Sequence, residues 1–515
     1  MQALELRQLS KRFGAVQANV GVSLSVQPGT IHGLIGENGA GKSTAAKMIY
    51  GLYKPDSGEI QIRGEHKIWK SPADAIAAGI GMVHQHFMLA GPHTALDNVV
   101  LGAEPAKARL DWMPRFSRPL DRASARKRLE KICKENGFQV DWDAPISSLS
   151  VGIQQRIEIV KLLFRNADIL ILDEPTAVLT PQETQDLFLT LRRLRDKGKT
   201  ILIITHKLKE VMAITDRVTV FRQGKISGAI ETKDASPEKL AELMVGRKVQ
   251  LKIEKPPAPK TGEKVFEMNA VTLKGSGGRD SLRDLSFSVR AGEVVGIAGV
   301  EGNGQSELLQ SVLRPLPWSK QRRLSGEIRV LGKTTTRLET RQIRSLGVGF
   351  VPEDRHHEAL LLESSVEENF LLGHQRDPRF SSGPMLRWSE IRSTVHAAAD
   401  EYDVRPRDPS VLSKGLSGGN QQKLIIAREF FKKPKFLVAA QPTRGVDIGA
   451  IEFIHRRILD ARTAGAGVLL ISSELDEILA LSDRILVLYE GHIVAEYARG
   501  QADEKTLGLK MGGGV

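Results

Sequence analysis

The stretch Gly36-Glu37-Asn38-Gly39-Ala40-Gly41-Lys42-Ser43-Thr44 decides the fold of this chain. It fits the pattern G-x-x-x-x-G-K-[ST], and the mainly apolar residues 31–35, which predict a buried strand, come directly before it. Glycines in such a loop let backbone N–H groups approach a phosphate closely, at a helix N-terminus whose dipole favours anions. A buried strand, a glycine loop and a helix in this order therefore predict a nucleotide-phosphate site.

Four side chains carry the expected chemistry, two in this loop and two at the end of a later apolar run. Lys42 is expected to reach the β- and γ-phosphates of a nucleotide, and the Ser43 hydroxyl to bind Mg²⁺. A second apolar run, residues 169–172, ends in Asp173 and Glu174. Asp173 is placed for the Mg²⁺ shell, and Glu174 is a candidate to orient and deprotonate the attacking water. The alternative for Glu174 is a carboxylate that caps a helix.

The second half of the chain repeats these motifs in the same order. Ser417 follows Ser150 by 267 residues, and two further pairs of equivalent positions keep the same separation. A register this constant indicates a duplication, so 515 residues are expected to form two domains. Continuous apolar strands that alternate with helices predict a mainly parallel α/β sheet in each.

The pattern also predicts where each domain begins and ends. Alternating apolar residues at 22–26 and 285–289 predict further β-strands, and the strand signal disappears between about 115 and 160, which predicts a helical subdomain. The predicted ranges are 3–246 for domain 1, 247–263 for a proline-rich, solvated linker, 264–508 for domain 2 and 509–515 for a tail, disordered from Met511.

The second copy has lost the charged residues of the first. The equivalents of Lys42, Asp173, Glu174 and His206 are Gln305, Ala440, Gln441 and Ser473. Gly299, Gly304 and Ser306 remain in its loop, so this impaired site could still hold a nucleotide, with a lower affinity because the lysine charge is absent. The sequence thus predicts one working nucleotide site and one degenerate site.

Bulk composition limits the other possibilities. The single cysteine, Cys133, excludes an internal disulfide and is expected to be a buried thiol on a helix face. The N-terminus lacks the features of a signal peptide, and no run of eighteen apolar residues predicts a membrane span. The formal charge of +13 is spread along the chain, as on a solvated surface, although it would also suit acidic partners.

Residues 149–155 and 416–422 resemble the signature motif of the ABC-type ATPases, which are P-loop NTPases with a helical subdomain and an antiparallel β part. Gln85 resembles the glutamine loop of that family, which also contacts Mg²⁺, and His206 resembles its switch histidine. Phe13 is in the position of an aromatic residue that stacks on adenine. From the residues alone, Phe13 is equally well a core aromatic and His206 a satisfied core histidine.

The resemblance implies that two such domains pair head to tail within one chain. One ATP site would then combine the motifs of domain 1 with a signature and an aspartate from domain 2. The residues expected to bind ATP there are Phe13, Gly36, Asn38, Gly39, Gly41, Lys42, Ser43, Thr44, Ser417, Gly418, Gly419 and Asp447. The degenerate site would combine Gly299, Gly304, Gln305, Ser306, Ala440, Gln441 and Ser473 with Ser150 and Gly152.

Tandem copies with a decayed second copy resemble the ATP-binding subunits of bacterial importers for simple sugars and nucleosides. Residues 84–89 and 352–356 look most like the nucleoside branch. That resemblance implies ATP and Mg²⁺ as cofactors, transmembrane permease subunits as partners (two copies or two different chains), a solute-binding protein as an indirect partner, and a peripheral place on the cytoplasmic face of the inner membrane. The alternative is a soluble tandem ATPase acting on ribosomes or nucleic acid. The short linker and the loss of the catalytic residues from the second copy favour the importer, so no nucleic acid is expected as a partner.

Overall fold

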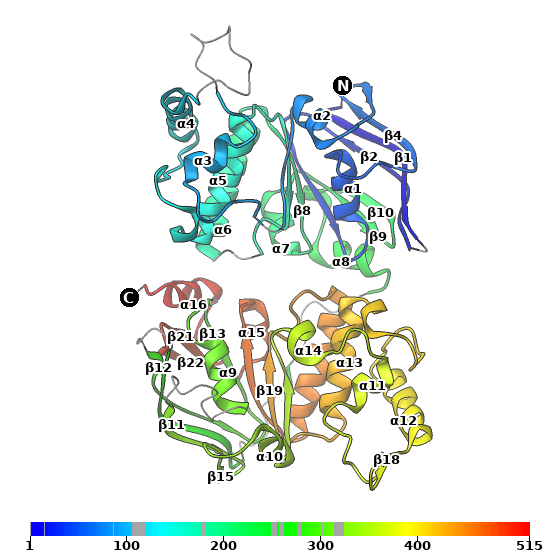
Figure 1. Cartoon of the computed structure of the whole chain (residues 1–515), viewed down its shortest axis with the longest axis vertical. Coiled ribbons are helices and arrows are strands. Elements are labelled where there is room, and N and C mark those ends of the chain that lie inside the picture. The colour runs from blue at the N-terminus through cyan, green and yellow to red at the C-terminus, as the bar shows by residue number, and fades with distance from the viewer. Residues whose placement is uncertain are drawn as a thin grey trace. The chain divides into compact units, whose positions relative to one another are not determined.

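The computed structural model describes residues 2–14, 16–85, 87–105, 120–177, 179, 181–248, 255–256, 262–275, 280–300, 302–313 and 324–514. The chain forms two compact units, Met1–Val249 (unit 1) and Gln250–Val515 (unit 2). Each unit is described by itself below (Figure 1).

Unit 1 contains two sheets. A four-stranded antiparallel sheet has the order β2-β1-β4-β5, formed by β1 (Leu4–Phe13), β2 (Val16–Val26), β4 (Ser57–Ile62) and β5 (Glu65–Lys67). A six-stranded sheet has the order β10-β9-β3-β8-β7-β6, formed by β3 (Ile31–Gly36), β6 (Ile80–Val83), β7 (Ile169–Asp173), β8 (Thr200–Ile204), β9 (Arg217–Arg222) and β10 (Lys225–Glu231). Five of its strands are parallel and only β10 is antiparallel.

The helices of unit 1 cover the parallel sheet and build the helical subdomain that the sequence predicts. They are α1 (Lys42–Ile49), α2 (Pro72–Ala77), α3 (Ala95–Val100), α4 (Arg122–Asn136), α5 (Val151–Phe164), α6 (Pro181–Asp196), α7 (Leu208–Ile214) and α8 (Pro237–Val245). In Figure 1, α3, α4 and α5 lie on one side of the unit and the four-stranded sheet on the other. Cys133 is buried on α4, as predicted.

Unit 2 repeats this architecture. Its antiparallel sheet has the order β12-β11-β14-β15, formed by β11 (Lys264–Lys274), β12 (Asp280–Arg290), β14 (Leu324–Val330) and β15 (Lys333–Thr334). Its six-stranded sheet has the order β16-β19-β20-β13-β21-β22, formed by β13 (Val294–Ala298), β16 (Val348–Val351), β19 (Phe436–Ala440), β20 (Gly467–Ser472), β21 (Arg484–Tyr489) and β22 (His492–Ala498). This order matches that of unit 1 strand for strand, which confirms the duplicated α/β fold.

The helices of unit 2 also follow the order of unit 1. They are α9 (Gln305–Leu313), α10 (Thr340–Ser345), α11 (Val366–Leu371), α12 (Trp388–Glu401), α13 (Gly418–Phe430), α14 (Ile448–Thr463), α15 (Leu475–Leu481) and α16 (Glu504–Met511). A short hairpin of β17 (Ser381–Ser382) and β18 (Met385–Leu386) precedes α12, and residues Arg355–Ala359 form one π-helical turn, η5.

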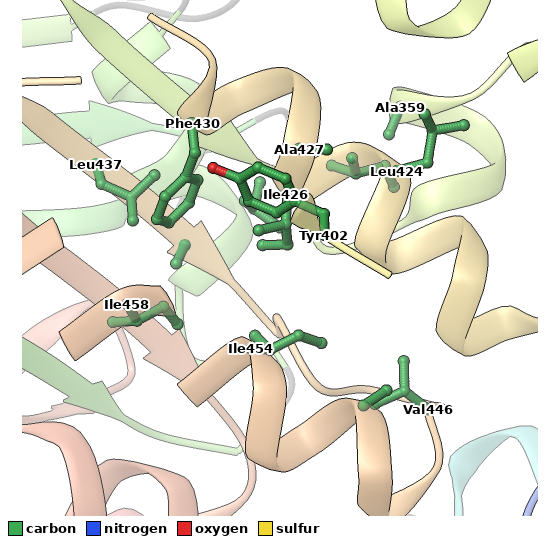
Figure 2. Packing of buried hydrophobic residues seen from close by; sticks show 14 of the residues in the cluster. Ala359, Tyr402, Leu424, Ile426, Ala427, Phe430, Leu437, Val446, Ile454 and Ile458 are labelled. Carbon is green, nitrogen blue, oxygen red and sulfur yellow. The ribbon is translucent and has the colours of Figure 1, made fainter. Parts of the chain in front are cut away.

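The core of unit 2 fixes the position of α13, the helix that begins at the second signature motif. Ile426 and Phe430 of α13 are buried in one hydrophobic cluster with Leu437 of β19 (Figure 2). Ile454 and Ile458 of α14 belong to the same cluster. Burying side chains of this size stabilises a fold by roughly 1.5–3 kcal/mol each, so α13 is held firmly against the sheet and α14.

Two predictions about the linker and the tail are wrong. The linker is predicted to be solvated, but the Lys255 side chain is only 1% exposed and forms an ion pair with Asp483 at 2.7 Å. The Arg462 guanidinium also donates to the Pro256 carbonyl, so this part of the linker packs on unit 2. The tail is predicted to be disordered from Met511, but Met511 is buried at the end of α16 and its carbonyl accepts a hydrogen bond from Asn303. Residues 249–254, 257–261 and Val515 lie outside the described residues.

Candidate functional site

The loop between β3 and α1 has a backbone that requires glycine. Gly36 and Gly41 have φ of 153° and 100°, and Gly39 has φ of 78°. A Cβ at Gly36 would lie 2.3 Å from the Phe221 carbonyl oxygen, and a Cβ at Gly41 would lie 2.4 Å from the Ala18 carbonyl oxygen. Both clashes involve backbone atoms, so a side chain at either position would distort the loop. The exposed Asn38 lies in the same loop.

Lys42 is held inside this loop. Its Nζ donates to the carbonyl oxygens of Gly36 and Glu37 at 2.8 and 2.9 Å, and the residue is 5% exposed. Burial lowers the pKa of Lys42, although the nearby carboxylates of Glu174 and Asp173 oppose that shift. The loop therefore concentrates a cation and backbone donors at the start of α1, where Thr44 lies in the first turn.

The donor set next to Lys42 fits a magnesium ion. The Ser43 hydroxyl donates to Asp173 Oδ1 at 3.2 Å. Burial raises the pKa of Asp173, against the lowering effect of the Ser43 hydrogen bond, so its charge is only partly compensated by the protein. A hydroxyl and a buried carboxylate side by side are the kind of oxygen ligands that Mg²⁺ takes together with phosphates.

The Glu174 carboxylate contacts two other predicted site residues, Gln85 and His206. Gln85 Nε2 donates to its Oε2 at 2.8 Å, and its Oε1 lies 3.2 Å from His206 Nδ1. The His206 hydrogen bond lowers the pKa of Glu174, while burial opposes this shift, so the group is an ionised base at neutral pH. Glu174 has φ of 48°, a strained conformation of the kind that concentrates at functional sites. Its carboxylate therefore faces Gln85 and His206 and does not act as a helix cap.

A buried carboxylate that the sequence analysis did not identify braces this arrangement. Glu210 of α7 accepts hydrogen bonds from the Thr176 and Thr205 hydroxyls at 2.6 and 3.2 Å. Thr176 follows Glu174 by two residues and Thr205 immediately precedes His206. Glu210 thereby ties together the two segments that carry the base and the histidine.

Phe13 lies at the end of β1 and is 43% exposed. Its ring packs edge-on against Tyr53 with centroids 5.1 Å apart, and Lys11 Nζ lies 5.5 Å from the ring centroid. Such exposure does not fit the core alternative. It leaves the ring available for stacking on a flat ligand.

The equivalent loop of unit 2 keeps the backbone but not the charge. Gly302 and Gly304 have φ of 95° and 112°, which are similar to the positive values of Gly39 and Gly41 in unit 1. Gln305 Nε2 donates to the Val300 carbonyl at 3.0 Å, so the amide lies inside the loop as the Lys42 ammonium does. A Cβ at Gly299 would lie 2.3 Å from that Nε2 atom. Ser306 donates to Glu353 Oε1 at 2.8 Å.

No base stands at the Glu174 position of unit 2. Ala440 is fully buried, and Gln441 has φ of 45°, close to the value for Glu174. Gln441 Oε1 accepts from the Ser473 N–H and hydroxyl, both at 3.1 Å. The strained backbone is thus conserved while the carboxylate and the histidine are gone. An amide cannot accept the proton of an attacking water.

The two signature segments start helices in a similar way but differ in detail. Ser417 caps α13, and its hydroxyl accepts from Asn420. A Cβ at Gly419 would lie 2.6 Å from Asp447 Oδ2, and Asp447 itself caps α14 through Ala450 N at 2.7 Å. In unit 1, Ser150 precedes α5 without a side-chain cap, and Gly152 lies against Glu183. Val151 is exposed where the second copy has Gly418.

The turn after Glu353 makes contacts that the sequence analysis also missed. Arg355 donates to the carbonyl oxygens of Arg444 and Gly445 at 2.9 and 3.3 Å. His356 lies 2.9 Å from Gln421 Oε1 on α13. This single turn of π-helix therefore contacts both the signature helix and the segment that leads to Asp447. Their partners lie 65 to 90 residues away in the chain, so no local pattern marks these contacts.

Comparison with known proteins gives consistent matches. The family model described as "ABC transporter" matches residues 20–177 and 282–444. A guanosine import ATP-binding protein of Bacillus subtilis is 46% identical over 99% of this chain and 97% of its own length. A glucose import ATP-binding protein of Haloferax volcanii is 46% identical (99% and 96%), and a nucleoside import ATP-binding protein of Lactococcus lactis is 44% identical (99% and 98%).

A solved structure of a nucleotide-free ATP-binding cassette from an ABC transporter is 29% identical, with a TM-score of 0.40. It covers 45% of this chain and 92% of that chain. Among the helices in the described part of the chain, none has the length and apolar character needed to cross a membrane.

Proposed function

This chain belongs to the ABC transporter family, and we propose that it is the ATP-hydrolysing subunit of a bacterial importer for nucleosides or simple sugars. As a member of this family it is an ATPase coupled to transport. The observation that carries the proposal is that the charged residues of the nucleotide site are present in only one of the two units. Unit 1 keeps the lysine, the carboxylates and the histidine, whereas unit 2 has replaced all of them.

In the proposed competent site, unit 1 supplies the nucleotide-holding groups. Lys42 and the loop N–H groups would hold the phosphates, and Phe13 would stack on the adenine. Ser43 and Asp173 would hold Mg²⁺, with Gln85 beside them, and the ion would neutralise charge that develops on the transferred phosphoryl group. Glu174 would accept the proton of the attacking water, oriented by Gln85 and His206.

Unit 2 is proposed to complete that site with its own intact signature. Ser417 and the N–H groups at the start of α13 (Gly418 and Gly419) would stabilise γ-phosphate charge, and Asp447 would contribute across the domain pair. Pairing would thus couple nucleotide binding to a conformational change that hydrolysis reverses. The reciprocal site, with Gln305, Gln441 and Ser473 opposite Ser150 and Gly152, would not hydrolyse ATP.

Solute choice would belong to partner proteins. Permease subunits, in two copies or as two different chains, would form the path through the membrane, and a solute-binding protein would deliver the solute to them. The full-length matches to guanosine, nucleoside and glucose import proteins support the nucleoside and sugar classes. The chain would then work as a peripheral protein on the cytoplasmic face of the bacterial inner membrane.

The proposal is tested on the complex that contains the chain. The tagged chain is purified from detergent-solubilised native membranes, its companions are identified by mass spectrometry, and ATP turnover is measured. Glu174→Gln should lower turnover at least about 100-fold while ATP still binds, because a positioned base contributes 10²–10⁴-fold. Gln441→Ala should leave turnover close to that of the unaltered chain.

Two results would contradict the proposal. Equal loss of turnover in both variants would refute a single hydrolytic site. Recovery of ribosomal proteins or nucleic acid with no polytopic membrane protein would refute the importer.

A further inference from the structure

Unit 2 contains a hydroxyl–carboxylate pair that resembles the pair proposed to hold Mg²⁺ in unit 1. In unit 1 the second residue of α1, Ser43, donates to Asp173 at 3.2 Å. In unit 2 the second residue of α9, Ser306, donates to Glu353 at 2.8 Å. The same helix position therefore has a carboxylate partner in both units.

The two carboxylates come from different strands of the sheet. Asp173 is the last residue of β7, and the equivalent last residue of β19 is Ala440, which has no ligand atom. Glu353 instead follows β16, the strand that pairs with β19 in the parallel sheet. The carboxyl ends of adjacent parallel strands share one edge of the sheet, so a carboxylate lost from one strand can be replaced from its neighbour.

The surroundings of this pair retain the features of a phosphate loop. Gly302 and Gly304 keep the positive φ angles of their counterparts, and α9 begins directly after the loop. Gln305 is 8% exposed, and its Oε1 is buried without a hydrogen-bond partner among the described residues. Gln305 directly precedes Ser306 in the chain, and a buried, unpaired oxygen in this loop is a group that a cation, or water bound to a cation, would satisfy.

We propose that unit 2 binds a magnesium–nucleotide through Ser306 and Glu353, with Glu353 replacing the aspartate that is missing at position 440. The ligand class is a nucleoside di- or triphosphate, whose phosphates lie on the loop that ends in Gly304. Because Gln305 is neutral, the metal supplies the positive charge that Lys42 adds to the ion in unit 1.

This second site holds its nucleotide without cleaving it. Gln441 lies where Glu174 lies in unit 1, and its side-chain oxygen is already bound to Ser473. Neither residue can accept a proton from water at neutral pH. The inference rests on the proposed function only in assigning hydrolysis to unit 1, and the carried solute has no bearing on it.

The test counts metal ions in the full chain. Mn²⁺ replaces Mg²⁺, a non-hydrolysable ATP analogue is present, and bound Mn²⁺ is counted by electron paramagnetic resonance. The unaltered chain should bind one Mn²⁺ in each unit. Glu353→Ala and Ser306→Ala should each abolish the ion of unit 2 alone, and Asp173→Ala should abolish the ion of unit 1 alone.

Two further variants separate ligand loss from misfolding. Glu353→Gln keeps an oxygen for Ser306 but removes the charge, and should weaken Mn²⁺ binding in unit 2 at least about tenfold, since even indirect partners of metal ligands are worth 10–100-fold. The exposed Glu363, which pairs with Lys414, serves as a matched control, and Glu363→Ala should leave both ions in place.

Other outcomes decide against the inference. If the unaltered chain binds Mn²⁺ in unit 1 only, or if Glu353→Ala leaves the count unchanged, Glu353 is not a metal ligand. A photoreactive ATP that labels unit 2 equally well with and without Mg²⁺ would also overturn it. These results are independent of the turnover of Glu174→Gln, so failure here and failure of the importer proposal are distinguishable.

Discussion

Glu210 connects the two segments that hold the proposed base and the switch histidine. Glu210 accepts hydrogen bonds from the Thr176 and Thr205 hydroxyls, which are both buried. Glu210→Ala would leave these two hydroxyls without that acceptor, at a cost of about 1–3 kcal/mol each. Displacing Glu174 by about 1 Å can lower turnover roughly 100-fold. We therefore expect a large fall in kcat with a smaller change in KM for ATP.

Steady-state kinetics and thermal melting of the same samples would check this expectation. Glu210→Gln retains an acceptor for at least one hydroxyl and should recover part of kcat, whereas a stability effect alone would lower the melting temperature with kcat unchanged. The exposed Glu238 on α8 provides a control position.

Single residues also show what the sequence could and could not predict. Lys42 and Ser43 follow from a contiguous pattern, because a glycine loop before a helix has one dominant use. The roles of Glu210 and Glu353 depend on partners 34 and 47 residues away in the chain. Such contacts arise from strand order and helix packing, and neither composition nor periodicity encodes them locally. For Phe13, the sequence left two roles open, and the exposure of its side chain argues against the core role.

At the scale of elements, the start of α13 packs directly on the start of α14. A Cβ at Gly419 would lie 2.6 Å from Asp447 Oδ2 and 3.3 Å from the Ala450 Cβ. Gly419→Ala should therefore push the Asp447 carboxylate away from Ala450 N and remove the α14 cap, at a cost of about 1 kcal/mol. Because Asp447 is also a proposed site residue, turnover should fall as well.

Hydrogen exchange would measure this effect locally. The amides at the start of α14 should exchange faster in Gly419→Ala than in the unaltered chain. Gly415→Ala is a suitable control, since the nearest atom to its Cβ would be Val411 Cγ1 at 3.9 Å. Equal exchange in both variants would show that the Asp447 cap survives the added methyl group.

Element order was the most predictable feature of the molecule, because buried parallel strands are apolar along their whole length. The linker was less predictable. Its prolines and lysines indicate solvation, but Lys255 is buried in an ion pair with Asp483. A buried lysine is stable only beside a carboxylate that the fold supplies, and Asp483 lies over two hundred residues later in the chain.

At the scale of the whole molecule, two buried histidines, His32 in unit 1 and His374 in unit 2, should make the protein sensitive to acid. His32 of β3 lies against Thr219 Oγ1 at 2.8 Å, and His374 lies against the Arg428 carbonyl at 3.0 Å. Burial lowers the pKa of each histidine to about 4. In the unfolded chain both have pKa values near 6.5.

The sign of the pH dependence follows from this difference. Between pH 6.5 and 4 the unfolded chain binds protons that the folded chain does not, so the stability that is complete above pH 6.5 is lost as the pH falls. Each histidine should lower the free energy of unfolding by about 1.4 kcal/mol per pH unit over much of this range. Asp354 and Asp377, whose hydrogen-bond partners lower their pKa to about 2, should add to the loss mainly below pH 4.

Denaturant unfolding at a series of pH values between 7 and 4.5 would test this expectation. His32→Gln and His374→Gln should each reduce the slope of the free energy of unfolding against pH by the contribution of one histidine, because a neutral amide has no proton to gain. The exposed His66 is the control, and His66→Gln should leave the slope as it is in the unaltered chain. A slope unaffected by either buried substitution would mean that other groups govern acid unfolding, and that the burial of His32 and His374 has no part in it.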